Sequence, residues 1–273
     1  MQLGEPVAAS WKAHLSLQFS KSLSRTILSD RRSDGPLVVQ KALYPEGPQV
    51  CHAIVVHPPG GIAGGDELSL HVNNGRDAKA LLTTPGAGKW YRSRGPWAKQ
   101  KLHFAAEGDL EWLPRETIVF NGALADFQCH VDLKPDARFI GWEIVCLGRS
   151  GSGERFDKGE IRLATTVARD GRLLFYERGR IEGGASLMRS PAGLGGRSVF
   201  GTLFAAAEIE TNLLSECRRR VPECAVTLLP GLLVARYLGD SSEEAFQAFA
   251  SLWRVLRPAV LRREAIEPRI WRT

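Results

Sequence analysis

Apolar and polar residues alternate along most of this chain in short runs, which is the pattern of half-buried β-strands. In residues 11–19 the apolar side chains of Trp11, Ala13, Leu15, Leu17 and Phe19 fall on one side. Similar extended runs follow, separated by turn signals, at residues 36–40, 54–57, 67–72, 78–84, 100–105, 110–114, 117–120, 127–133, 138–146 and 173–178. Such a succession predicts a mainly β fold of stacked sheets, either a sandwich or a β-helix-like stack. No fixed-length repeat is evident, so a regular β-helix is not specified.

Helical periodicity appears only in the last third of the chain. Residues 208–220 carry apolar side chains at helical spacing, and Pro222 stops the pattern. A second helix is predicted from the cap and acidic turn at 240–244 through an apolar stripe to Leu256, with Pro258 ending or kinking it. Nothing marks a linker, so we expect one domain over residues 1–273 with two α-helices near the C-terminus.

The composition is ordinary for a soluble globular protein, with 44% hydrophobic and 24% charged residues. The net charge of +6 is spread too diffusely to indicate nucleic-acid binding. The start of the chain does not resemble a signal peptide, and no run approaches the roughly 18 apolar residues of a membrane helix. The five cysteines include no C-x-x-C pair, which favours reduced thiols. We therefore expect a cytoplasmic protein without a membrane partner.

One stretch, His57–Asp66, combines two prolines, two glycine pairs and a terminal carboxylate. Proline fixes φ and glycine permits positive φ, so this segment is a tightly specified turn. It either presents Asp66, its only carboxylate, or simply joins two strands. The local pattern leaves both interpretations open.

Several familiar catalytic motifs fail in detail. The segment Thr83–Lys89 lacks the first glycine and the final hydroxyl residue of a phosphate-binding loop, and it runs into Trp90 without a helical pattern. The six histidines never show paired metal-ligand spacing, and no Gly-x-Ser-x-Gly elbow is present. These observations argue against an NTPase and a serine hydrolase.

Three carboxylates are harder to assign to an ordinary surface. Asp66 ends the turn, Glu143 lies within the apolar run 139–147, and Glu177 follows the apolar run 173–176. A carboxylate among large apolar residues is costly to bury unless it is paired or ligates a cation. The interpretations are an internal ion pair, with Arg149, Arg178 or Arg180 as partners, and a metal or polar-channel role.

Five segments resemble, in order and spacing, the urease accessory protein family called UreD, or UreH in some organisms. They are His57–Asp66, Thr84–Ser93, Glu111–Pro114, Gly141–Arg149 and Pro268–Trp271. Two positions depart from the usual family pattern: Gly88 often corresponds to a small hydroxyl residue, and Glu143 can be Asp. The resemblance covers nearly the whole chain and implies a mostly β fold of stacked strands with two C-terminal helices.

The resemblance also implies a protein that is not an enzyme. The family is a scaffold and nickel conduit in urease maturation: it binds accessory protein F, which recruits the GTP-hydrolysing accessory protein G, and the assembly docks on the urease apoprotein. A dimer of such heterocomplexes is expected. Nickel would pass through an internal tunnel in transit, with no cofactor permanently bound. Asp66, Glu143 and Glu177 match the family's candidate tunnel carboxylates, and are the predicted metal-binding residues.

Two other hypotheses remain at this stage. A metal-dependent hydrolase would use Asp66 with the neighbouring His57 or His71. A purely structural scaffold would have no metal function, and the glycine-rich turn would be architecture alone. The aromatic tail around Trp271 either packs against the strands or faces accessory protein F.

Overall fold

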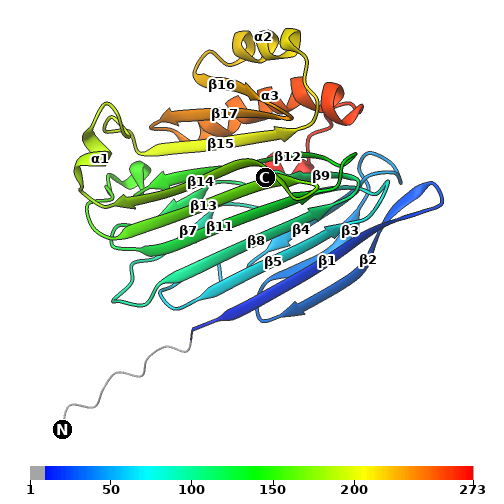
Figure 1. Cartoon of the computed structure of the whole chain (residues 1–273). Helices are drawn as coiled ribbons and strands as arrows, with labels where there is room; N and C mark the ends of the chain where they lie inside the picture. The colour runs from blue at the N-terminus through cyan, green and yellow to red at the C-terminus, as the bar shows by residue number, and fades with distance from the viewer. Residues whose placement is uncertain (1–9, 273) are drawn as a thin grey trace.

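The computed structural model describes residues 10–272, and the expectation of a mainly β fold is confirmed (Figure 1). Sheet A has the strand order β14-β13-β11-β8-β5-β1-β2. Its strands are β1 (Lys12–Ser22), β2 (Arg25–Asp34), β5 (Glu67–Asn74), β8 (Ala98–Ala106), β11 (Leu124–Leu133), β13 (Glu160–Arg169) and β14 (Arg172–Glu182).

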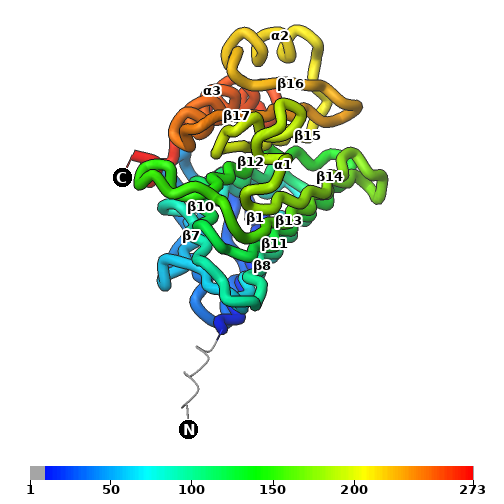
Figure 2. The backbone as a smooth tube through the Cα atoms, turned by 90° about the vertical axis from the view of Figure 1, so that its left-hand side faces the viewer, coloured from blue at the N-terminus to red at the C-terminus, as the bar shows by residue number. Residues whose placement is uncertain are grey.

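Sheet B has the order β16-β17-β15-β12-β9-β6-β4-β3, and two short strands attach to it beside β12. The main strands are β3 (Val38–Leu43), β4 (Cys51–Val56), β6 (Lys79–Thr83), β9 (Asp109–Trp112), β12 (Arg138–Leu147), β15 (Val199–Ala206), β16 (Cys224–Leu229) and β17 (Leu232–Gly239). The short strands are β7 (Gly88–Trp90) and β10 (Thr117–Val119). They lie on the side opposite β8, β11 and β13 (Figure 2).

The middle of the chain winds repeatedly through both sheets. Strands β5, β8, β11 and β13 are parallel neighbours in sheet A, and β4, β6, β9 and β12 are parallel neighbours in sheet B. Of the two architectures predicted, the winding part is therefore the β-helix-like stack. Glu67 pairs with Lys99 and Lys99 with Asp126, so successive windings differ in length, which explains the absence of a fixed repeat.

Antiparallel strands close both ends of the stack. At one end β1 pairs with β2, and at the other β13 pairs with β14 and β15 with β17. The predicted alternation in β1 is confirmed for Ala13, Leu15, Leu17 and Phe19, which are all buried. The prediction for Trp11 was wrong: this residue precedes the strand and is 53% exposed, because sheet A ends before it.

Three α-helices occur among residues 10–272, namely α1 (Ser186–Arg189), α2 (Thr211–Arg220) and α3 (Ser242–Leu261), together with two short 3₁₀ helices, Ser150–Ser152 and Arg269–Arg272. The two predicted helices correspond to α2 and α3, which lie with β15–β17 above the winding part of the chain (Figure 1). Ser241 caps α3 by accepting a hydrogen bond from the Glu244 backbone N–H. The helix does not end at Pro258 but continues to Leu261, since burial of Val260 and Leu261 holds the last turn. No helix in this part of the chain is long and apolar enough to cross a membrane.

Two apolar clusters result from this layering. One fills the space between the two sheets, and the other lies between sheet B and the helices. Strand β12 contributes to both, because alternate residues of a strand face opposite sides. Val145 and Leu147 enter the first cluster, whereas Trp142 and Ile144 enter the second. Glu143 has the parity of Val145 and therefore faces the space between the sheets.

The aromatic tail packs against the protein itself. The Trp271 ring lies 5.8 Å from that of Trp142, 5.1 Å from Phe246 and 5.4 Å from Trp253. Its indole N–H donates to Thr83 Oγ1 at 3.0 Å. Of the two predicted placements, the structure thus shows packing of the tail against α3 and sheet B.

Candidate functional site

A cavity of about 380 Å³ lies beside the two glycine-rich segments singled out in the sequence. Its lining includes residues 60–62 of the turn, residues 84–90 of the following motif, and Glu143. Backbone hydrogen bonds join the two segments, from Ile62 N–H to Lys89 O and from Tyr91 N–H to Ile62 O, each 2.8 Å long. Segments that are separate in sequence therefore form one wall.

Two glycines of the turn permit this close approach. A Cβ atom at Gly61 would lie 2.0 Å from the Tyr91 ring, and one at Gly64 would lie 2.3 Å from Ser93 Oγ and 2.8 Å from the Pro96 carbonyl. A side chain at Gly64 would clash with the backbone at Pro96, whereas one at Gly61 would displace the Tyr91 ring. The turn is thus specified by packing as well as by its backbone angles.

Asp66 closes this turn. Its carboxylate accepts hydrogen bonds from Trp11 N–H at 2.7 Å and from Ala63 N–H at 2.8 Å, and the residue is only 3% exposed. It does not belong to the cavity lining. Each carboxylate oxygen of Asp66 already accepts a hydrogen bond from the backbone. Asp66 therefore has the structural role of holding the turn together. A metal role for Asp66 stays a prediction.

His57 connects the turn to the cavity. Burial lowers the pKa of its imidazole, and the negative charge of Asp66 partly opposes that shift. His57 is one of the cavity-lining residues, and its buried Nε2 has no hydrogen-bond partner among residues 10–272. An unpaired buried nitrogen is costly. His57 is therefore a cavity-lining residue with an unpaired buried nitrogen.

Glu143 is the carboxylate of the cavity wall. It lies on β12, a central strand, on the face that sheet A covers, yet its side chain is only half-buried. The accessible surface of Glu143 therefore faces the cavity between the sheets. Burial raises the pKa of Glu143 to about 7; the negative charge of Glu177 adds to the rise, and the Arg236 guanidinium opposes it. Near neutral pH this carboxyl group can release or take up a proton.

Glu177 and Arg236 form the neighbouring polar pair. Glu177 accepts from Arg236 Nη2 at 2.8 Å and from Nη1 at 3.3 Å, and the two side chains are 37% and 46% exposed. They come from β14 of sheet A and β17 of sheet B, so the ion pair bridges the sheets at a place open to solvent. On sheet A the Cys129 thiol lies close by, and its pKa is raised by burial and by the charge of Glu143.

The structure thus brings together two of the three predicted metal-binding residues. Glu143 and Glu177 interact electrostatically, whereas Asp66 is engaged in the turn. Arg236 was missed by sequence reasoning, which offered Arg149, Arg178 and Arg180 as partners of these carboxylates. Arg236 comes close to these carboxylates because β17 lies two strands from β12. Thr202 of β15, the strand between them, is in register with both Arg236 and Glu143. The pattern of apolar and polar residues within one strand does not predict this register.

The two histidines named for the hydrolase hypothesis lie in different places, and of these His57 is the one on which the charge of Asp66 acts. His57 borders the interior cavity, whereas His71 lies on the outer face of sheet A, where its ring is 5.5 Å from that of His103. Likewise, the segment Thr83–Lys89 leads into strand β7 and not into a helix, as the sequence indicates. An anion there would meet no helix N-terminus.

Comparison with known proteins identifies the family of this chain. The family model described as UreD urease accessory protein matches residues 12–272. A urease accessory protein UreD from Azoarcus sp. is 52% identical, covering 96% of this chain and 94% of its own length. UreD proteins of Dechloromonas aromatica and Pseudomonas aeruginosa are 52% and 51% identical, with 97% of this chain and 95% and 96% of their lengths covered. The chain belongs to the UreD urease accessory protein family.

Proposed function

We propose that this protein acts in urease maturation as a non-enzymatic scaffold and nickel conduit, with Glu143 and Glu177 as ligands to nickel in transit. The observation that carries the proposal is the position of Glu143, a carboxylate facing internal space on the wall of a cavity that the family motifs enclose. Asp66 would shape the entrance by holding the turn and would contribute its charge next to His57.

The chemistry of this pair suits transient binding. Carboxylate oxygens hold a late first-row divalent ion less firmly than thiolates or several imidazoles do. Because the pKa of Glu143 is raised to about 7, a cation entering near neutral pH competes with a proton for that carboxylate. Glu177 is already neutralised by Arg236. Both features weaken the binding of nickel, which favours its passage over its storage. Nickel is thus the cargo of the protein, and no cofactor is permanently bound.

The partners we propose are accessory protein F, the accessory GTPase G and the urease apoprotein, assembled as a dimer of heterocomplexes in the cytoplasm. Support comes from the family membership and from the names of the relatives, which are urease accessory proteins. No nucleic-acid or membrane partner is included. The energy source would be the GTPase, since the phosphate-loop-like segment of this chain runs into a strand.

The test is urease activation in cells that carry Glu143→Gln and Glu177→Gln, singly and together. We expect the double variant to lose most nickel-dependent activation while still co-purifying with proteins F and G and the apoprotein. Glu182→Gln is a matched control, because Glu182 lies on the same strand β14 but its side chain is 61% exposed. This control should activate urease as the unmodified chain does.

The two parts of the proposal fail separately. Full activation by the double variant would reject the conduit and leave the scaffold intact. Absence of any complex between the unmodified protein and accessory protein F would reject the scaffold. For the hydrolase, both carboxylate oxygens of Asp66 are engaged by backbone donors, and of the two candidate histidines only His57 lies near Asp66.

A further inference from the structure

A row of histidines crosses the outer face of sheet A, away from the cavity. His71, His103 and His130 are in register on the parallel strands β5, β8 and β11. Their ring centroids are 5.5 and 5.4 Å apart, and His14 on β1 adds a fourth ring 5.0 Å from that of His71. No individual run of the sequence contains this ladder, because parallel pairing assembles it from four strands.

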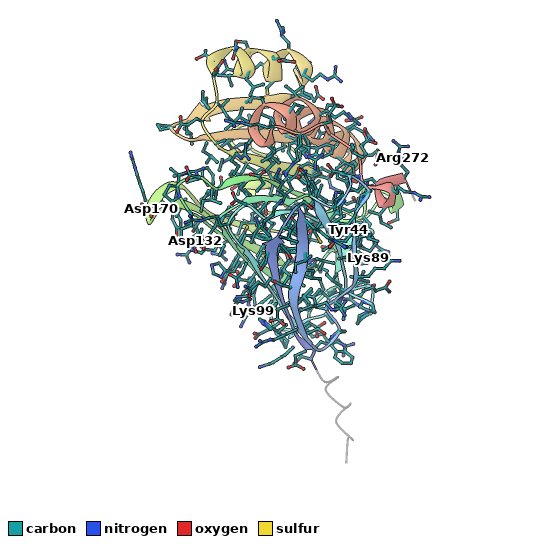
Figure 3. All side chains as sticks on the ribbon, turned by 90° about the vertical axis from the view of Figure 1, so that its right-hand side faces the viewer. Tyr44, Lys89, Lys99, Asp132, Asp170 and Arg272 are labelled. Carbon is teal, nitrogen blue, oxygen red and sulfur yellow. The ribbon has the colours of Figure 1, made fainter. Side chains whose placement is uncertain are left out.

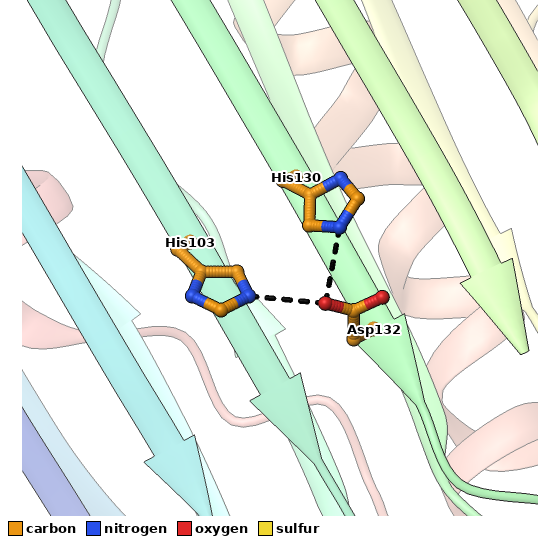
Figure 4. Close-up of side chains that lie close together, drawn as sticks. All are labelled: His103, His130 and Asp132. Atoms are coloured by element: carbon orange, nitrogen blue, oxygen red, sulfur yellow. Dashed lines mark hydrogen bonds and ion pairs between the residues drawn. The ribbon is translucent and has the colours of Figure 1, made fainter. Parts of the chain in front are cut away.

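Asp132 turns one end of the ladder into a cluster of three residues that can ligate a metal ion. It lies two residues after His130 on β11 and so shares its face. Its Oδ2 atom lies 3.0 Å from Nε2 of His103 and 3.0 Å from Nε2 of His130 (Figure 4). The side chains are 40%, 48% and 47% exposed for His103, His130 and Asp132. All three ligand atoms lie within 4.8 Å of one another.

We propose that His103, His130 and Asp132 form a second, surface binding site for a divalent first-row transition metal ion such as Ni²⁺ or Zn²⁺. This site is separate from the interior carboxylates and does not depend on the proposed conduit. Asp132 lies on the side of the molecule opposite Lys89, which borders the cavity (Figure 3).

The distances from the two imidazole nitrogens to the carboxylate match those between ligands of one metal ion. Metal–nitrogen and metal–oxygen bonds of about 2.0–2.2 Å place neighbouring ligand atoms of one ion about 3 Å apart. That spacing matches the 3.0 Å separations between each imidazole nitrogen and the carboxylate oxygen. Two imidazoles with one carboxylate suit zinc, nickel or copper and not magnesium or calcium, which prefer oxygen ligands alone.

The strands also hold the ligands in place. His103 and His130 face each other across a parallel ladder whose hydrogen-bonded pairs extend from Ala98–Ala125 to Ala106–Leu133. Ligands on strands are positioned more precisely than ligands on loops. Three protein ligands leave the remaining coordination positions to water, and exposure to solvent gives an ion direct access. The site can therefore exchange its metal without opening of the fold.

Isothermal titration of the untagged full-length protein with Ni²⁺ and with Zn²⁺ tests the proposal. We expect His103→Ala/His130→Ala to lose one binding site per chain, and Asp132→Asn to weaken that site at least about tenfold, since even outer-shell partners have effects of 10–100-fold. His14→Ala is the matched control: it removes an exposed imidazole of the same ladder but no ligand. X-ray absorption of the zinc-loaded protein should show imidazole scattering that the double variant loses.

A further variant separates this site from the conduit. Glu143→Gln/Glu177→Gln should keep the surface site, whatever its effect on urease activation. The proposal is overturned if His103→Ala/His130→Ala, with an unchanged circular dichroism spectrum, binds either metal with the stoichiometry and affinity of the His14→Ala control. It is also overturned if Asp132→Asn leaves the affinity unchanged.

Discussion

Glu177 of sheet A and Arg236 of sheet B form an ion pair 2.8 Å long that bridges the two sheets beside Glu143. The two residues are 59 positions apart in the chain. Their charges act on Glu143 in opposite directions: Glu177 raises its pKa and Arg236 lowers it. Burial is the main cause of the raised pKa of Glu143, and a pair that solvent can reach adjusts that pKa in addition.

Arg236→Met should raise the pKa of Glu143 above its value of about 7, because the variant removes a nearby positive charge and leaves Glu177 uncompensated. The pKa can be measured from the side-chain carboxyl ¹³C resonance of Glu143 as pH is varied. Arg178→Met is the matched control, since Arg178 is an exposed arginine next to Glu177 on β14. An equal pKa of Glu143 in the two variants would contradict the predicted coupling.

Glu143→Gln should change how stability depends on pH. The pKa of Glu143 rises from an ordinary value of 4.5 when unfolded to about 7 when folded, so the folded state binds this proton more tightly. The stabilisation of the folded state by this proton is fully present below pH 4.5 and is lost as pH rises through about 7. Glutamine does not titrate and escapes that loss.

The variant should therefore gain stability relative to the unmodified protein between pH 5 and pH 8, by up to about 3 kcal/mol at roughly 1.4 kcal/mol per pKa unit. Urea unfolding at the two pH values gives the free energies to compare. The data at pH 5 serve as the internal reference for any packing effect of the amide. A difference between the proteins that is the same at pH 5 and pH 8 would refute the raised pKa.

Asp66→Ala should destabilise the protein more than Asp66→Asn does. Alanine leaves the N–H groups of Trp11 and Ala63 without their acceptors, and a hydrogen bond to a charged group contributes about 1.5–3 kcal/mol. Asparagine keeps one carboxamide oxygen and should retain one of the two bonds. Chemical unfolding of the three proteins measures the order. Equal stability of the alanine variant and the unmodified protein would show that the turn does not depend on Asp66.

Arg257→Met should be among the more damaging substitutions in the core. Arg257 and Glu111 have no exposed side-chain surface, and Arg257 also bonds Glu46, so its loss removes the closest positive charge from two buried carboxylates. Removing one member of a buried pair typically costs about 3–5 kcal/mol. Urea unfolding measures that cost. The double variant Arg257→Met/Glu111→Gln should recover part of it, and a cost that is unchanged by the second substitution would contradict the pairing.

Much of the architecture could be predicted because it depends on patterns within short segments of the sequence. Alternation in β1 and the apolar stripe of α3 report burial directly, since a residue's face follows from its position within the element. Strand β2 was overlooked because it is an edge strand with few buried residues, so it lacks the alternation that signals a half-buried strand. Parallel pairing was not specified either, because the windings that bring β5, β8 and β11 together have unequal lengths.

The candidate site divides in the same way. The sequence by itself determined that the chain is mainly β, that it resembles the UreD family, that residues 57–66 form a constrained turn, and that Glu143 sits among apolar neighbours. Only the tertiary structure decided that Asp66 is engaged by backbone donors, that Arg236 partners Glu177, and that three histidines align beside Asp132. The physical reason is the distance along the chain over which each effect acts. Backbone angles and side-chain parity act over a few residues, whereas charge pairs and ligand sets depend on which strands become neighbours and in which register.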